Sequence, residues 1–169
     1  MIVRILILSL AAVAVLVCAV TAVGYALPQN HVASREASLP ARPEAIFDLI
    51  GDVARHPEWR PDVAKVEVLA TEPLKWREYS GDDVVTFEAT EKRRPDLLRV
   101  RITDPDLPFG GTWTYEVAPE ATGTHLRITE RGEVYNPIFR FASRFVLGHT
   151  STIDRFISNL QRKVSASPR

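Results

Sequence analysis

Cysteine is almost absent from this chain of 169 residues, and its single copy, Cys18, lies inside an apolar run near the N-terminus. The remainder of the chain therefore offers no disulfide and no thiolate nucleophile. Neither sign of charge is in excess, since 21 basic residues balance 21 acidic ones and no basic run is longer than three residues. Nucleic-acid binding, which usually needs a concentrated basic surface, is thus disfavoured.

Standard catalytic and metal-binding signatures are also missing. The sequence has no Gly-x-Ser-x-Gly elbow, no phosphate-binding glycine loop and no His-Glu-x-x-His, and its four histidines lack metal-ligand spacing. His56, which precedes Pro57 in a predicted turn, is expected to have no chemical role. We expect no metal and no cofactor. An enzyme of this composition would depend on a shaped pocket and one or two proton carriers.

Residues 5–26 form a nearly continuous apolar run, interrupted only by Ser9 and Thr21. Such a run is long enough to cross a hydrocarbon core of about 30 Å at 1.5 Å per residue. We predict that residues 1–27 are a transmembrane anchor or an uncleaved signal. A cleaved signal is the alternative, because Gly24 and Ala26 suit a cleavage site, although signal cores usually span only about 7–15 residues. A buried core helix is disfavoured, since the run has no amphipathic stripe.

The charges around this run indicate its orientation. Arg4 and the amino terminus precede it, whereas no charge follows it until Arg35. The positive-inside rule therefore favours a cytoplasmic N-terminus and a single-pass protein whose soluble domain is extracytoplasmic.

After a short linker at 28–31, residues 32–165 are predicted to form one domain, followed by a tail at 166–169. Apolar periodicity and turn residues predict a strand at 31–39, a helix within 39–52 and a short helix or turn at 53–63. Six strands are expected next, at 63–69, 74–80, 84–92, 97–103, 112–118 and 124–134. Asn136 and Pro137 are a good helix start, and a long amphipathic helix is predicted over 136–164. The fold class is α+β, with the last helix covering a curved antiparallel sheet.

Residues 41–63 resemble the opening of SRPBCC proteins, the superfamily of START, plant-pollen-allergen and polyketide cyclase/dehydrase-like proteins. In that opening a proline precedes a helix that ends near an aspartate, and a proline-tryptophan turn follows; the matching residues here are Pro43, Phe47, Asp52, Pro57 and Trp59. The resemblance covers residues 32–164. It implies a helix-grip fold, in which a seven-stranded sheet wraps around a long C-terminal helix with a ligand cavity between them.

Strand alternation and the helical stripe predict which side chains line that cavity. The ligand-binding candidates are Trp76, Phe87, Glu91, Val100, Trp113, Tyr115, Ile128, Glu130, Phe141, Phe145 and His149. Glu130 and His149 are also the catalytic candidates, as a carboxylate and an imidazole on apolar faces. The alternatives are that strand ends turn outward, that a lone histidine is a satisfied core residue, and that aromatics simply fill the core.

Two further aromatic residues are predicted near the cavity entrance. Trp59, between two prolines, is expected to cover the mouth. Phe109 belongs to an ordered turn at 104–111, where it could gate the cavity, touch the membrane or fold back to plug the end of the sheet.

These patterns together predict a membrane-anchored binding or carrier domain for a hydrophobic small molecule, either a lipid or a polyketide-like compound. One alternative is a cyclase or dehydratase that uses the same cavity. Another is a non-catalytic interaction module whose cavity has closed.

Overall fold

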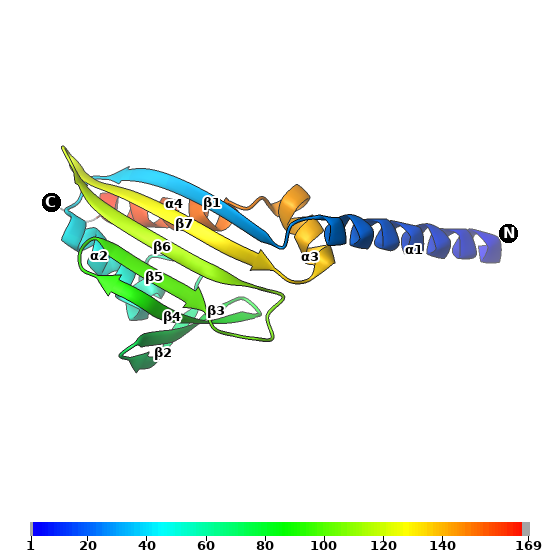
Figure 1. Cartoon of the computed structure of the whole chain (residues 1–169), viewed down its shortest axis with the longest axis horizontal. Coiled ribbons are helices and arrows are strands. Elements are labelled where there is room, and N and C mark those ends of the chain that lie inside the picture. Colours follow the sequence, from blue (N-terminus) through cyan, green and yellow to red (C-terminus); the bar gives the residue numbers. More distant parts are fainter. Residues whose placement is uncertain (1, 167–169) are drawn as a thin grey trace.

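The computed structural model describes residues 2–166 and shows a long N-terminal helix followed by one α+β domain (Figure 1). The helices are α1 (Ile2–Ala26), α2 (Pro43–Gly51), the 3-10 helix η1 (Val53–Glu58), α3 (Pro137–Ala142), the π-helical turn η2 (Ser143–Leu147) and α4 (Ser151–Ala166). The strands are β1 (Asn30–Leu39), β2 (Lys65–Thr71), β3 (Leu74–Ser80), β4 (Asp83–Arg93), β5 (Leu97–Ile102), β6 (Phe109–Glu120) and β7 (Gly123–Val134).

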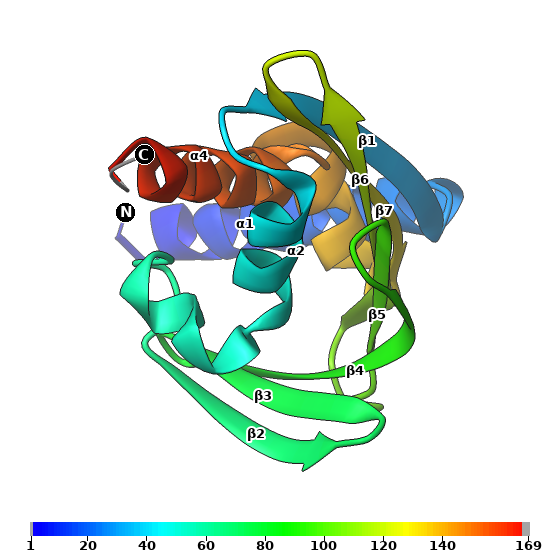
Figure 2. The same ribbon diagram turned by 90° about the vertical axis from the view of Figure 1, so that its left-hand side faces the viewer.

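The seven strands form one antiparallel sheet in the order β1-β7-β6-β5-β4-β3-β2. Strands β2 to β7 follow one another as a meander, and β7 then pairs with β1, so that α2 and η1 carry the chain between the two edges. The sheet curves around α4 and α2 (Figure 2). The predicted helix-grip architecture is therefore confirmed.

The core lies between the concave face of the sheet and α4. Alternation along β7 places Leu126 and Ile128 fully inside, and α4 contributes an apolar stripe that includes Ile153, Phe156 and Leu160. Burying such side chains stabilises a fold by about 1.5–3 kcal/mol each relative to leaving them exposed.

The closing helix begins at Ser151, not at Asn136 as the periodicity predicts. Asn136 does start a helix, because its side chain accepts hydrogen bonds from the backbone N–H groups of Ile138 and Phe139, at 2.9 and 3.1 Å. That helix is α3, which ends after six residues and passes through η2 to Gly148. Gly148 has φ +75°, a conformation that interrupts a right-handed helix and that glycine adopts readily.

A bulge in β4 also changes one predicted face. Ala89 pairs with Val100 but Glu91 pairs with Arg99, so the register shifts by one residue at position 90. Glu91 consequently leaves the inward face and forms ion pairs with Arg99 at 2.6 Å and with Arg93 at 3.2 Å. An extra residue of this kind reverses the alternation beyond it.

The helix α1 projects away from the domain (Figure 1), and its side chains are almost all exposed. Its 25 residues are long and apolar enough to cross a membrane, and a signal sequence would have the same properties.

Candidate functional site

A cavity of about 400 Å³ lies between the concave face of the sheet and α4. Its apolar wall is largely aromatic. Trp76 of β3 stacks on Phe87 of β4 with ring centroids 5.4 Å apart. Tyr115 of β6 and Phe156 of α4 lie 5.3 Å apart, so the wall continues from the sheet onto the helix. The volume is within the range of about 300–1,000 Å³ that is typical of small-molecule sites.

Seven of the eleven predicted ligand-binding residues line this cavity: Trp76, Phe87, Val100, Trp113, Tyr115, Glu130 and His149. The other four do not. Glu91 lies on the opposite face of the sheet for the reason given above, and Ile128 is fully buried in the core. Phe141 and Phe145 lie against each other in α3 and η2, with ring centroids 4.9 Å apart, because the helix predicted to direct them inward is broken.

The two catalytic candidates are brought together by a third residue, His31. The imidazole of His31 stacks on that of His149 with centroids 4.1 Å apart, and its Nε2 lies 3.6 Å from Oε1 of Glu130. Glu130 comes from β7, His31 from the start of β1 and His149 from the turn before α4. These three side chains, the Glu130 cluster, form a titratable group on the cavity wall.

Burial sets the ionisation of this cluster. It raises the pKa of Glu130 to about 7, although a hydrogen bond from Trp113 partly opposes the rise. Burial also lowers the pKa of His31, and the neighbouring His149 lowers it further. The pKa of His149 is lowered by burial and then by the charge of Arg144. A carboxyl group that titrates near neutral pH can exchange protons with a ligand.

Gly132 makes room for this arrangement. It is the cross-strand partner of His31, and a Cβ atom at position 132 would lie 2.3 Å from Cε1 of His31. A side chain at this position would therefore displace the imidazole from Glu130.

A second polar group, the Glu78 network, lies deeper in the cavity. The buried carboxylate of Glu78 accepts hydrogen bonds from His56 Nδ1 at 3.0 Å, Arg60 Nη1 at 2.9 Å and Trp76 Nε1 at 3.1 Å. His56 Nε2 lies 3.0 Å from the carbonyl oxygen of Ile50. Burial by itself would raise the pKa of Glu78, but the hydrogen bond from His56 and the charge of Arg60 hold it below its usual value.

The Glu78 network extends to the closing helix. Arg60 also donates to Asp62 at 3.1 Å, and Asp62 accepts from Asn159 of α4 at 2.8 Å. These contacts tie η1, β3 and α4 together beside the cavity. The network thus fixes the shape of the cavity as well as part of its polarity.

Sequence reasoning missed most of these polar residues. His56 was expected to have no role, yet it is buried and lines the cavity. The available signal was the alternation in residues 74–80, which puts Glu78 on the same face as Trp76. His31 offered no such signal, because its proximity to Glu130, 99 residues away in sequence, depends on pairing between β1 and β7.

The two aromatics predicted at the entrance have different positions. Trp59 is buried, packs edge-on against Phe156 with centroids 5.3 Å apart, and does not line the cavity, so the predicted cover over the mouth is wrong. Phe109 begins β6, lines the cavity and stacks on Phe139 of α3 with centroids 6.1 Å apart.

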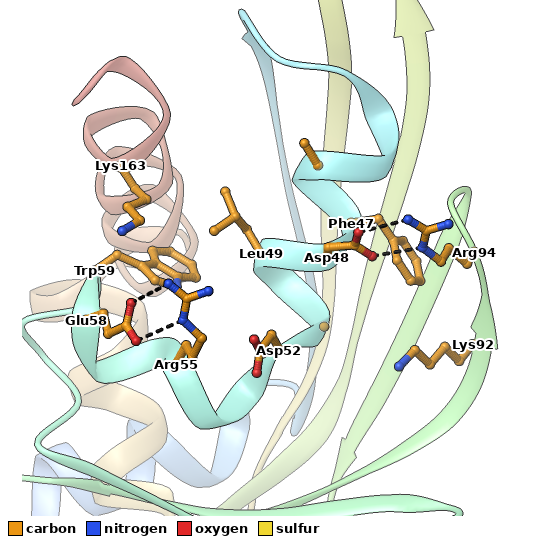
Figure 3. A pocket seen from close by; sticks show the side chains of 12 residues that line it. Phe47, Asp48, Leu49, Asp52, Arg55, Glu58, Trp59, Lys92, Arg94 and Lys163 are labelled. Carbon is orange, nitrogen blue, oxygen red and sulfur yellow. Dashed lines mark hydrogen bonds and ion pairs between the residues drawn. The ribbon is translucent and has the colours of Figure 1, made fainter. Parts of the chain in front are cut away.

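A second groove, of about 380 Å³, lies among α2, η1, the end of α4 and the β4–β5 turn (Figure 3). Four of its charged side chains form two pairs: Arg94 makes two hydrogen bonds of 2.8 Å to Asp48, and Arg55 makes two of 2.8 Å to Glu58. Exposed ion pairs of this kind are typical of a hydrated surface. The cavity under α4 is therefore a better ligand site than this groove. Residues 2–166 bring together no group of three His, Cys, Asp or Glu side chains fit to hold a metal ion.

Comparison with known proteins agrees with this geometry. Residues 30–165 match a family described as polyketide cyclase / dehydrase and lipid transport. No curated protein matches the chain by sequence comparison. Among solved structures, a START superfamily protein from Mycobacterium smegmatis is 17% identical with a TM-score of 0.64, and the match covers 80% of this chain and 97% of that one.

Two further solved structures have similar folds. Truncated norcoclaurine synthase from Thalictrum flavum is 14% identical with a TM-score of 0.66, covering 82% of this chain and 96% of that one. The di-domain ARO/CYC BexL from the BE-7585A biosynthetic pathway is 12% identical with a TM-score of 0.69, covering 83% of this chain and 52% of that one. At these identities the likeness concerns the fold alone.

Proposed function

Since the chain belongs to the polyketide cyclase / dehydrase and lipid transport family, we propose that it is a membrane-anchored domain that binds a hydrophobic small molecule, a lipid or a polyketide-like compound. The observation that carries this proposal is the cavity of about 400 Å³ with its aromatic wall and its two localised polar groups. Removal of apolar ligand surface from water, at about 25 cal/mol per Å², supplies the affinity in such a site. The polar groups orient the ligand.

The anchor is part of the proposal. In it, α1 is retained as a single span, the soluble domain at 32–165 lies on the extracytoplasmic side, and residues 28–31 are the connection. Support comes from the length and apolar character of α1 and from the positive charges that precede it. A domain held at a bilayer meets membrane-dissolved ligands at high effective concentration.

Filling the cavity tests the proposal. Ile102 of β5 lines the cavity, whereas its neighbour Arg101 is exposed on the other face of the sheet. We expect Ile102→Trp to reduce the amount of ligand that accompanies the full chain in mild detergent by at least about tenfold, because the indole occupies the ligand volume. Arg101→Trp, the matched control, should leave the amount unchanged. The measurement is native mass spectrometry followed by extraction and identification of the bound compound.

Three outcomes of this experiment are distinguishable. A stoichiometric ligand in the wild type and the control, lost in the Ile102 variant, supports the proposal. Equal amounts of lipid in all three proteins would indicate binding to the α1 surface and contradict it. A wild-type protein without any ligand would contradict it as well and favour the closed interaction module.

The Glu130 cluster favours a second candidate function, a cyclase or dehydratase that uses the same cavity. A carboxyl group with a pKa of about 7 beside two imidazoles suits general acid–base chemistry. If the protein converts the compound recovered from its cavity, we expect the double variant Glu130→Gln, His149→Ala to lower kcat by about 10²-fold or more while binding persists. Turnover of that compound at the wild-type rate by the double variant would exclude this function.

A further inference from the structure

Exposed apolar side chains gather in one short segment of the domain. Outside α1, the described residues have nine large apolar side chains that are exposed, and five of them come from the twelve residues 135–146. Val146 is 73% exposed and Phe145 is 59% exposed. We call these five side chains the apolar collar; they are Tyr135, Ile138, Phe139, Phe145 and Val146.

The collar is fixed to the end of α1. Arg140 Nη1 donates to the carbonyls of Gly24 and Leu27 at 3.1 and 3.0 Å, and its Nε donates to the carbonyl of Val134 at 3.0 Å. A cation that binds the last carbonyls of a helix satisfies them and complements the helix dipole. Gly24 also packs directly on α3, because a Cβ atom there would lie 2.0 Å from the carbonyl oxygen of Pro137.

The length of the span places this contact at the membrane surface. Arg4 is the only charged side chain of α1, and Gly24 follows it by 20 residues. At 1.5 Å per residue, 20 residues cover about 30 Å, the thickness of the hydrocarbon core. With Arg4 at one interface, Gly24 lies at the other, and α3 lies beside it.

The composition of the segment suits that depth. Between Glu133 and Asp154 the sequence contains no acidic residue, but it contains Arg140 and Arg144. Aromatic rings with a cationic partner are typical of segments that lie at the boundary of headgroups and acyl chains. The collar includes the aromatic residues Tyr135, Phe139 and Phe145.

The cavity is most open at the same end of the domain. Its exposed lining residues lie where β4 begins, where β7 ends, in α3 and around the start of α4, and they include Asp83, Glu133, Phe139, Gly148 and Thr152. Those elements form the end of the domain from which α1 projects (Figure 1). Phe139 belongs both to the collar and to the cavity lining, where it stacks on Phe109.

We propose that the apolar collar lies in the interfacial layer of the bilayer that α1 spans, so that the cavity opens onto the acyl chains and receives its ligand directly from the membrane. The surface that the collar contacts is a phospholipid leaflet. This inference rests on the retained anchor of the proposed function and adds the route of ligand entry.

Depth-dependent fluorescence tests the position of the collar. The experiment uses the full chain, in which Cys18→Ser removes the native cysteine and Val146→Cys introduces a single one for an environment-sensitive dye. The labelled protein is reconstituted into phosphatidylcholine vesicles that contain a nitroxide-labelled lipid. Ala121, exposed in the β6–β7 turn at the opposite end of the domain, provides the matched control as Ala121→Cys. We expect at least threefold quenching and a blue shift at 146 and neither effect at 121. The inference would be overturned if the label at 146 behaved as the one at 121. It would also be overturned if the label at 146 were shielded from water without being quenched by the lipid, which would indicate a second copy or a protein partner on the collar.

A paired variant separates this inference from the proposed function. Phe145→Glu with Val146→Glu places two charges in the collar, away from the cavity lining. We expect ligand exchange between this protein and surrounding vesicles to slow at least tenfold, while the ligand that accompanies the protein in detergent is unchanged. Unchanged exchange with retained ligand would contradict the entry route alone. The absence of ligand from both proteins, with quenching preserved at position 146, would contradict the proposed function alone.

Discussion

Replacing Glu78 by Gln is expected to lower the free energy of unfolding by about 3 kcal/mol. Glu78 is the common acceptor for three donors, from His56, Arg60 and Trp76, in a buried site. Glutamine preserves the volume and can keep one acceptor oxygen for these donors, all of which contact Oε1, but it removes the negative charge that together with Asp62 compensates Arg60. Breaking a buried charge pair by changing one partner typically costs 3–5 kcal/mol, because the other charge stays buried.

Tryptophan fluorescence during urea unfolding in mild detergent measures this loss. All three tryptophans, Trp59, Trp76 and Trp113, belong to the domain and none to α1, so the signal reports on the domain. Glu88→Gln is the matched control, because Glu88 forms a partly exposed pair with Lys75 at 3.7 Å and should contribute less than about 1 kcal/mol. If the two variants unfold at the same urea concentration, the Glu78 network has no special role in stability.

Replacing Glu130 by Gln is expected to have the opposite effect on stability. Above pH 7 this substitution should raise the free energy of unfolding by up to about 2–3 kcal/mol. The pKa of Glu130 is raised to about 7 in the folded protein, from an ordinary value of 4.5. The folded state therefore holds a proton that the unfolded state has released between about pH 4.5 and 7. Stability falls as the pH rises through this window, and the full penalty is present above it. Glutamine stays neutral and avoids the penalty.

The difference between wild-type and variant melting temperatures, measured from pH 5 to pH 8, checks this prediction. The difference should be small near pH 5 and grow towards pH 7. Glu116→Gln, at an exposed position on β6, should give a flat difference. A flat difference for Glu130 too would mean that its carboxyl group ionises normally in the cavity.

Glu78 shows why the two carboxylates differ. Its pKa is lowered by its hydrogen-bond donors, so its contribution to stability is present above the unfolded pKa and is lost as the pH falls through the folded pKa. Glu130 has Trp113 as its hydrogen-bond donor, and burial dominates. Opposite pH dependences from two buried glutamates in one cavity reflect the number of donors around each.

Local patterns in the sequence were sufficient for the architecture. The apolar run at 5–26 and the alternation in six strands predicted α1, the curved antiparallel sheet and its apolar inner face, including Trp113 and Tyr115. The helix-grip fold and its cavity were implied by the family resemblance of residues 41–63. These features depend on period and composition, which neighbouring residues define. Asn136 likewise predicted a helix start, because capping is a contact over two or three residues.

Only the tertiary structure decided the polar chemistry. The bulge at position 90 turned Glu91 outward, and the positive φ of Gly148 separated α3 from α4 and moved Phe141 and Phe145 out of the cavity. His31 lies beside Glu130 because β1 pairs with β7, and Glu78 accepts hydrogen bonds from His56 of η1 and Trp76 of β3. A single residue can shift a register or end a helix, and contacts between residues distant in sequence depend on the sum of such local choices. The sequence by itself therefore predicted the N-terminal apolar helix, the sheet and two ionisable residues of the cavity, Glu130 and His149. Their neighbour His31 and the Glu78 network were determined by how the strands and helices pack.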